Sequence, residues 1–236
     1  SIDISRKMPF VLQVFSWIKD EPLFHDEHGE ISKLLRVTIK GTNDQKMVDF
    51  GQRHGFPRGW SIVIMYGEHD QVIDVRFDAF YPKFANTTNV ELHSLIPDAQ
   101  SISVSEKHSG FLAMLGVLPL KTVDDRRCIG IYAKTTGHEG QQVYSLIHQM
   151  VKDEVPWLTP DLLDDVLKKG YTLGFEALSV YDNMHGYRVK QNKFMLTCVA
   201  MSKVSFVSQY MNPEDLNSYA DEMRIPKTPT FVVTGE

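Results

Sequence analysis

The chain has 236 residues, enough for one large domain or two small ones. Its 42% hydrophobic and 23% charged residues are typical of a globular protein. The formal net charge of −5 excludes nucleic-acid binding by bulk positive charge, so any such binding requires a local basic cleft. The two cysteines, Cys128 and Cys198, exclude a disulfide scaffold, and no apolar stretch is long enough for a membrane span. We expect an intracellular protein, cytoplasmic or nuclear, with reduced and buried cysteines.

The two ends of the chain suggest a piece of a longer protein. The sequence begins Ser1-Ile2-Asp3, without an initiator methionine or a signal-peptide pattern, and stops directly after an apolar run that ends at Glu236. There are no repeats, no low-complexity tracts and no long internal linker. We therefore expect one domain over residues 1–236, with further motifs or domains beyond it.

The first half of the chain predicts mainly strands. Residues 1–50 mix short apolar runs with polar turns, and residues 26–30 read as a loop. The β-branched and aromatic run 59–66, a turn at 67–70 and the returning run 71–77 predict a β-hairpin. Three more strands are predicted, with Lys107 near the bend between the first two: 101–105, 111–118 and 127–134.

Two helices follow in the prediction. Residues 140–152 have helical apolar spacing. Thr159 and Pro160 form a good N-terminus for a helix over 162–169, and Gly170 is the expected stop. Strands then return over 171–180 and 187–204, joined by a hairpin turn at 182–186. The sum is an α+β domain rich in antiparallel strands, with helices inserted between them.

Polar residues that could carry chemistry fall in five segments along these elements. The segments are Phe56-Pro57-Arg58-Gly59, residues 78–86 around Lys83, Lys107-His108-Ser109-Gly110, residues 132–137 around Lys134, and Gly174-Phe175-Glu176-Ala177. A Lys-x-x-Gly that opens an apolar strand is how a covalent nucleotidyltransferase presents its amine. An amine that attacks a phosphorus atom must be neutral, which nearby cations favour. In-line displacement of pyrophosphate then needs positioning and charge stabilisation, which several cations and one carboxylate supply.

The order and spacing of these segments resemble the ATP-dependent RNA ligase 1 family of bacteriophages and the related ligase domain of fungal tRNA ligases. Members of this family of covalent lysyl-nucleotidyltransferases carry an Arg-Gly before a strand hairpin and a Lys-Phe-Phe-Asn-like segment. A Lys-x-Asp-Gly nucleophile motif, a Lys-x-x-Gly strand end and a helix leading into a Phe-Glu-Phe-like strand then follow. The resemblance covers about residues 50–205, and residues 162–176 match most convincingly.

The resemblance implies a nucleotidyltransferase (ATP-grasp-like ligase) fold and an ATP-dependent RNA ligase activity. ATP and Mg²⁺ (or Mn²⁺) would be the cofactors, and Lys107 would form the covalent lysyl–AMP. Glu176 would accept ribose hydroxyls and also bind the metal. The residues expected to contact the nucleotide are Arg58, Lys83, Glu106, Gly110, Lys134 and Glu176. The partner would be RNA with 5′-phosphate and 3′-hydroxyl ends, which the enzyme would join in RNA repair or tRNA splicing. We expect a monomer that does not associate with membranes.

The sequence also departs from the family pattern. Ser109 replaces the aspartate of Lys-x-Asp-Gly, and Ala85 replaces the second aromatic of Lys-Phe-Phe-Asn. The later Glu-Gly and Lys-x-Lys strands have no clear counterpart; residues 190–193 follow Glu176 too soon and are interpreted as a solvated hairpin edge. Two alternatives stay open: an RNA-capping type nucleotidyltransferase, and a non-catalytic pseudo-ligase that binds RNA or a partner. The nine histidines show no zinc spacing.

Overall fold

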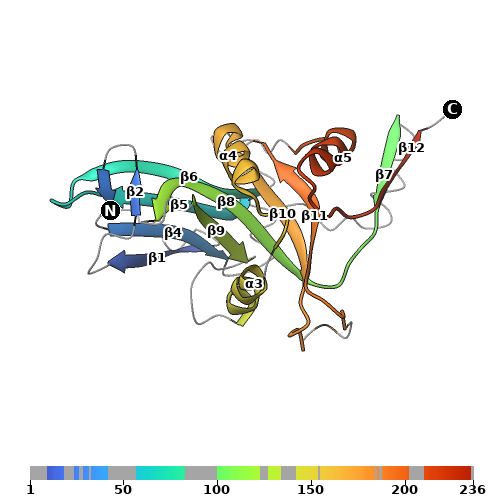
Figure 1. Cartoon of the computed structure of the whole chain (residues 1–236), viewed down its shortest axis with the longest axis horizontal. Coiled ribbons are helices and arrows are strands. Elements are labelled where there is room, and N and C mark those ends of the chain that lie inside the picture. Colours follow the sequence, from blue (N-terminus) through green and yellow to red (C-terminus); the bar gives the residue numbers. More distant parts are fainter. Residues whose placement is uncertain are drawn as a thin grey trace.

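The computed structural model places the chain in three antiparallel sheets and the helices that cover one of them (Figure 1). The described residues are 10–18, 24–26, 29–31, 33–41, 57–82, 100–122, 127–133, 142–153, 155–183, 185, 188–201 and 210–234. The elements are β1 (Phe10–Ile18), β2 (Phe24–Asp26), β3 (Gly29–Ile31), β4 (Lys33–Gly41), β5 (Pro57–Tyr66), β6 (Val72–Pro82), β7 (Ser101–Ser105), β8 (Phe111–Thr122), β9 (Arg127–Ala133), α3 (Gln142–Lys152), α4 (Pro160–Lys169), β10 (Thr172–Leu178), β11 (Lys193–Ala200), α5 (Pro213–Glu222) and β12 (Thr230–Thr234).

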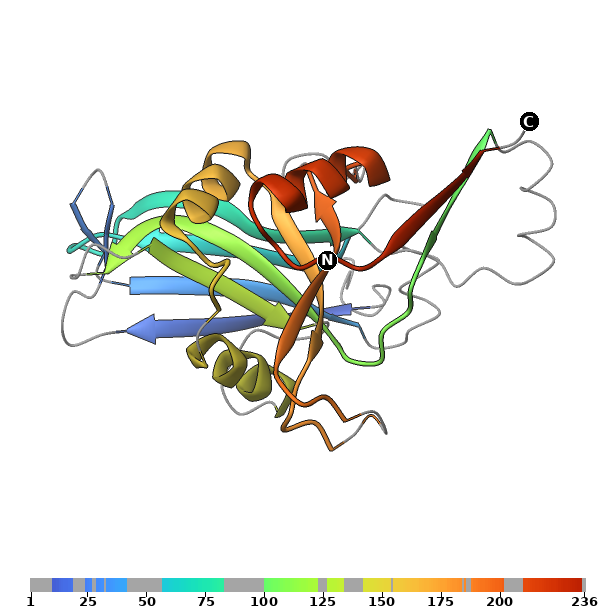
Figure 2. The same ribbon diagram turned by 45° about the vertical axis from the view of Figure 1, so that its right-hand side comes forward.

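The first sheet has the strand order β1-β4-β5-β6, and the second has β11-β10-β8-β2-β3 with β9 also paired to β8. Strands β7 and β12 form a separate two-stranded ribbon that extends from one end of the molecule (Figures 1 and 2). Every pairing between these strands is antiparallel. The predicted α+β class, rich in antiparallel strands with inserted helices, is therefore confirmed.

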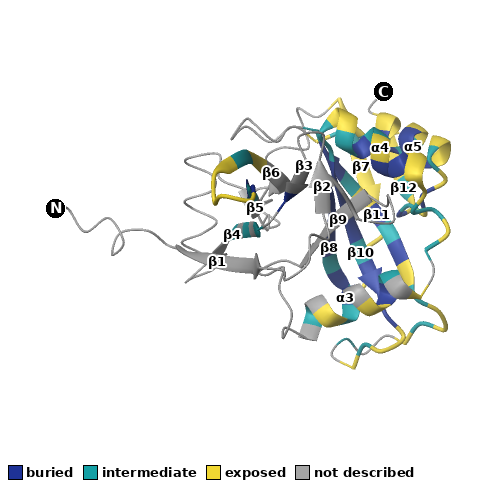
Figure 3. Ribbon diagram, turned by 60° about the vertical axis from the view of Figure 1, so that its left-hand side comes forward, coloured by how far each residue is buried: buried dark blue, intermediate teal, exposed yellow. Residues whose placement is uncertain are grey.

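Strand β8 runs through the core and is buried on both faces (Figure 3). Successive side chains of a strand point to opposite faces. Thus Val117 joins the cluster that includes α3, α4 and α5, whereas Leu118 packs with Val63 and Met65 of β5. One face of the second sheet is covered by helices, and the other is turned toward the first sheet.

Helix α4 forms as its sequence predicts. The Thr159 hydroxyl accepts a hydrogen bond from the backbone N–H of Leu162, which satisfies one of the unpaired donors of the first turn. Gly170 ends the helix in the left-handed conformation, with φ of 67°. Leu162 and Val166 are fully buried, so the helix presents its apolar side to the sheet.

The strands differ from the prediction in several places. Residues 1–50 contain β1 to β4, which short apolar runs alone did not reveal. The last predicted strand, 187–204, is shorter because the Asn192 side chain accepts a hydrogen bond from Val180 N–H and β11 begins only at Lys193. Strand β7 pairs with β12, so the two strands around Lys107 belong to different sheets. Cys198 on β11 is half-buried, where the sequence predicted a buried cysteine. Among the described residues no helix is long and apolar enough to cross a membrane.

Candidate active site

Lys107 lies on the irregular segment that connects β7 to β8. Lys107 and Ser109 are exposed, whereas the intervening His108 side chain is only 15% exposed, so the chain turns Lys107 toward solvent. The segment is anchored at its start, where Glu106 N–H donates a hydrogen bond to the Pro229 carbonyl at 3.1 Å. The exposed Glu106 carboxylate lies 3.7 Å from the Nδ1 atom of His108. The amine of Lys107 is therefore presented from a loop that is held at its base.

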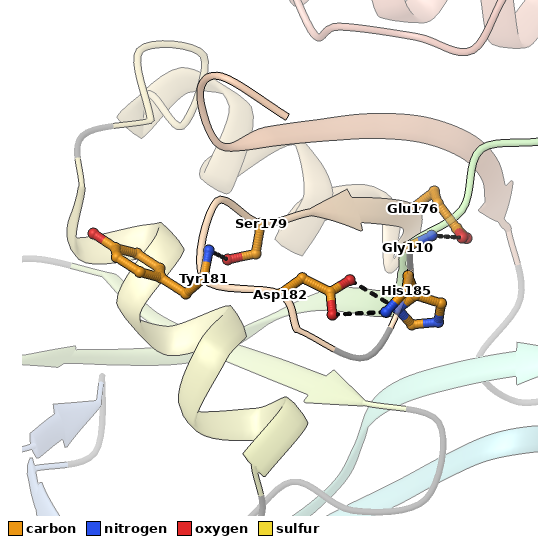
Figure 4. A network of polar contacts seen from close by, with 6 residues as sticks. All are labelled: Gly110, Glu176, Ser179, Tyr181, Asp182 and His185. Atoms are coloured by element: carbon orange, nitrogen blue, oxygen red, sulfur yellow. Dashed lines mark hydrogen bonds and ion pairs between the residues drawn. The ribbon is translucent and has the colours of Figure 1, made fainter. Parts of the chain in front are cut away.

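Gly110 fixes the other end of this loop (Figure 4). Its N–H donates a hydrogen bond to Oε1 of Glu176 on β10, with an N···O distance of 2.8 Å. A Cβ atom at Gly110 would lie 2.4 Å from the Ala177 carbonyl oxygen, which is too close for any side chain. The resemblance implies that Gly110 contacts the nucleotide. The close approach in the structure is to β10.

Glu176 is the carboxylate of this site. It is half-buried, and its neighbours on the same strand, Phe175 and Ala177, are buried on the helix-covered face. In register it pairs with Leu112 of β8 and Met195 of β11, so its side chain lies on the face turned toward the first sheet. One carboxylate oxygen holds the Lys107 loop, and no hydrogen bond from a described residue engages the other.

The ends of three strands meet beside this loop. Ala113 of β8 pairs with Phe175 of β10 on one side and with Ala133 of β9 on the other. Pro82, at the end of β6, pairs with Pro57 at the start of β5, and β6 contacts both β8 and β10. Strand pairing thus brings the start of β8, the end of β9 and the middle of β10 together, and it places the start of β5 beside the end of β6.

The other predicted site residues fall at these strand ends. Arg58 is the second residue of β5, but its side chain lies outside the described residues. Lys83 and Lys134 follow directly after β6 and β9, and both lie outside the described residues. Ala85 also lies outside them. The positions of these side chains relative to Lys107 stay predictions.

Sequence reasoning missed a polar pair that lies next to Gly110 (Figure 4). The Asp182 side chain is only 3% exposed and accepts two hydrogen bonds from His185, from its backbone N–H at 3.1 Å and from Nδ1 at 2.8 Å. The His185 ring packs edge-on against Phe111, with ring centroids 4.7 Å apart. An ionised carboxylate only accepts, so in this pair Nδ1 of His185 is the donor when Asp182 is ionised. The segment Asp182–His185 read only as a hairpin turn, although an Asp followed three residues later by a His is a readable signal for such a pair.

A metal site with three protein ligands is not present among the described residues, where no three His, Cys, Asp or Glu side chains cluster. Glu176 fits a different kind of site. Mg²⁺ in nucleotide-binding enzymes is commonly held by one or two carboxylates, substrate phosphates and water. A single carboxylate with one oxygen that no described residue engages can supply the protein ligand for that arrangement.

Comparison with known proteins gives matches to solved structures only. No protein-family model matches the sequence, and no curated protein is significantly similar to it. The chain is similar to Naegleria gruberi RNA ligase with PPi, at 11% identity and a TM-score of 0.40, over 94% of this chain and 84% of that one. It is also similar to a lysine-to-alanine mutant of the same ligase with ATP and Mn, at 9% identity and a TM-score of 0.41, over 94% of this chain and 83% of that one. Similarity at these values does not assign this chain to a family.

Proposed function

We propose that this chain is an ATP-dependent RNA ligase, or the adenylyltransferase domain of one, and that it carries AMP on Lys107. One observation supports this most directly: an exposed lysine lies on a loop that is tied through Gly110 to a half-buried carboxylate, Glu176. A nucleophile needs an accessible amine with a fixed approach to the reacting phosphorus. The resemblance of the ordered sequence segments to RNA ligases supports the choice of ATP and RNA.

The proposed reaction has three steps. The neutral amine of Lys107 attacks the α-phosphorus of ATP; an N–P bond forms, the bond to the β-phosphate oxygen breaks, and pyrophosphate leaves. An oxygen of an RNA 5′-phosphate then attacks the same phosphorus, the N–P bond breaks, and the amine is regenerated. Finally a 3′-hydroxyl attacks the activated 5′-phosphate, a phosphodiester forms, and AMP leaves.

The proposed roles of the other residues follow from their charges. Arg58, Lys83 and Lys134 bind phosphates or the nucleoside and offset the negative charge of the triphosphate. Glu176 accepts ribose hydroxyls and offers one oxygen to Mg²⁺, which when bound would neutralise the departing pyrophosphate. Gly110 and Glu106 hold the two ends of the Lys107 loop.

The first test is covalent labelling with α-³²P-ATP in the presence of Mg²⁺ or Mn²⁺. We expect wild-type protein to form an acid-labile label, because the bond is a phosphoramidate. Lys107→Arg keeps the positive charge but cannot attack, so it should not label. Lys168→Arg, at an exposed lysine of α4, is the matched control and should label normally. Labelling of Lys107→Arg at the wild-type level would exclude Lys107 as the nucleophile.

Glu176→Gln separates charge from structure. Glutamine retains an oxygen that can accept the Gly110 N–H, so the melting temperature should stay close to that of wild type. The loss of negative charge should lower lysyl–AMP formation by about tenfold or more, the scale of a single charge-assisted contact. A fall in both the melting temperature and lysyl–AMP formation would instead indicate that Glu176 has only a structural role.

Nucleotide preference distinguishes the related enzyme class. Labelling by α-labelled GTP in place of ATP would point to an RNA-capping type nucleotidyltransferase. RNA binding without label from either nucleotide would point to a non-catalytic relative, which the serine at position 109 favours.

A further inference from the structure

A second feature of the molecule is an open groove at the β11 edge of the second sheet. Its volume is about 950 Å³. It is bounded by the segment after α3, the bend after β10, the bend before β11 and the segment after α5. The residues used below that line it are Asp153, Tyr181, Lys190, Lys193, Met195 and Arg224.

The groove is basic, although the whole chain is acidic. Lys190, Lys193 and Arg224 are all exposed, and no described residue forms an ion pair with any of them. Asp153 is the one carboxylate among the described lining residues, and it accepts hydrogen bonds from Asn192 Nδ2 at 2.8 Å and from the Tyr181 hydroxyl at 3.3 Å. Three cationic side chains thus line a groove in which the Asp153 carboxylate already accepts hydrogen bonds from neighbouring residues. This is the local basic cleft that a chain of net charge −5 needs in order to bind a polyanion.

The groove also offers an open strand edge and an aromatic ring. The segment that leads to β12 covers β11 at Leu196, whose N–H donates to the Pro226 carbonyl at 2.8 Å. Residues Lys193 to Met195 precede that point, and no described strand pairs with their outer edge. Tyr181 is 52% exposed. A cationic surface with an accessible aromatic ring is the combination by which proteins bind single-stranded nucleic acid.

The groove is close to the Lys107 loop. Met195 pairs with Glu176 on β10, and Glu176 pairs with Leu112 on β8, two residues after Gly110. Neighbouring strands lie about 4.8 Å apart, so β11 and β8 are separated by roughly 10 Å here. A strand of nucleic acid in the groove would therefore pass within a few nucleotides of the proposed nucleophile.

We propose that this groove binds single-stranded RNA, with Lys190, Lys193 and Arg224 contacting backbone phosphates and Tyr181 stacking on a base. The choice of RNA rests on the proposed function. Three phosphate contacts account for a slope of about 2 in log Kd against log salt, at about 0.7 per contact for a single strand.

The experiment measures fluorescence anisotropy of a labelled 12-mer of adenosine RNA over a series of salt concentrations. The groove variant is Lys190→Ala/Lys193→Ala/Arg224→Ala. The control is Lys33→Ala/Arg76→Ala/Lys168→Ala, which makes the same change in net charge at residues outside the groove lining. Between about 50 and about 200 mM salt, wild type and the control should lose about 20-fold more affinity than the groove variant. Thermal melting of each variant checks that it is folded.

Tyr181 provides a second, charge-neutral arm. Tyr181→Ala should weaken RNA binding by about fivefold or more, the scale of one lost base stack, without changing the salt slope. Tyr181→Phe keeps the ring and loses only the hydrogen bond to Asp153, so it should bind like wild type.

Three outcomes would overturn the groove proposal: no RNA binding by wild type, equal salt slopes for the two triple variants, or displacement of the RNA by ATP alone. Labelling with α-³²P-ATP separates this proposal from the ligase proposal. The groove variant should form lysyl–AMP at the wild-type rate. RNA binding as expected, with no label on Lys107, would support the groove proposal and contradict the ligase proposal. Label on Lys107 without RNA binding in the groove would support the ligase proposal and contradict the groove proposal.

Discussion

At the scale of single residues, the Lys107 loop depends on one glycine and one carboxylate. Gly110 lies so close to β10 that a Cβ atom there would overlap the Ala177 carbonyl, and its N–H is held by Glu176. Backbone atoms cannot move aside as a flexible side chain can. The position of Lys107 is therefore set by a contact 66 residues away in sequence.

This contact predicts the effect of Gly110→Ala. The overlap should destabilise the protein by about 1–3 kcal/mol, the usual cost of overpacking, and displace the loop, so that lysyl–AMP formation falls. Gly67→Ala is the matched control, because its Cβ would first meet the end of the Gln71 side chain, which can swing away. Urea unfolding and ATP labelling measure the two effects. Equal behaviour of the two variants would contradict the role given to Gly110.

Some residues of the candidate site could be predicted from the sequence, and others could not. Lys107, Gly110 and Glu176 were predicted from motif order, and the structure brings the last two together. The Asp182–His185 pair was missed because its sequence also fits an ordinary turn. The packing of the His185 ring on Phe111 is what distinguishes a fixed Asp–His pair from an ordinary turn.

At the scale of elements, α4 and α5 are joined by a half-buried polar contact. The Tyr219 hydroxyl of α5 donates a hydrogen bond to Asp165 of α4 at 2.9 Å, and Lys169 pairs with the same carboxylate at 3.0 Å. Burial, and then the bond to Asp165, raises the pKa of Tyr219. The hydrogen bond to Asp165 likewise raises the pKa of Lys169.

These shifts predict a loss of stability at alkaline pH. Both groups hold their protons more tightly in the folded state, so their contribution is complete below about pH 10, the pKa of a free tyrosine, and is lost as the pH rises above it. Tyr219→Phe should cost about 1 kcal/mol at neutral pH, for the lost hydrogen bond, but should flatten the decline above pH 10. Melting temperatures at several pH values measure this. Tyr181→Phe controls for loss of a hydroxyl, and an unchanged decline in Tyr219→Phe would refute the assignment.

Local sequence signals predicted some elements better than others. Helix α4 carries its own N-cap and glycine stop, and the hairpin of β5 and β6 its own turn, so both were predicted correctly. Strands β1 to β4 carry no comparable local signal. They are stabilised by partners elsewhere in the chain, as β4 is by β5.

At the scale of the whole molecule, β8 links two of the hydrophobic clusters. Val117 belongs to the helix-covered cluster and Leu118 to the cluster with Val63 and Met65. Because adjacent residues of one strand support both, the loss of either cluster should disturb the other. The single domain predicted over residues 1–236 should therefore unfold as one unit.

Two substitutions test this cooperativity. Leu118→Ala and Leu162→Ala remove buried side chains from the two different clusters, and each should cost about 2–5 kcal/mol. Calorimetry of wild type should give one transition, and each variant should shift that whole transition to lower temperature. Two transitions, with each variant lowering only one of them, would indicate two independent domains instead.

The sequence by itself determined the α+β class, the position and caps of α4, and a lysine followed by a glycine at the entry to a strand. These properties depend on local periodicity, capping and turn residues, which are visible within a few positions of one another. Only the tertiary structure decided that Gly110 is fixed by Glu176, that β7 pairs with β12, and that Lys190, Lys193 and Arg224 line one groove. Those contacts join segments far apart in the chain, and antiparallel pairing between distant strands leaves no mark in either strand alone.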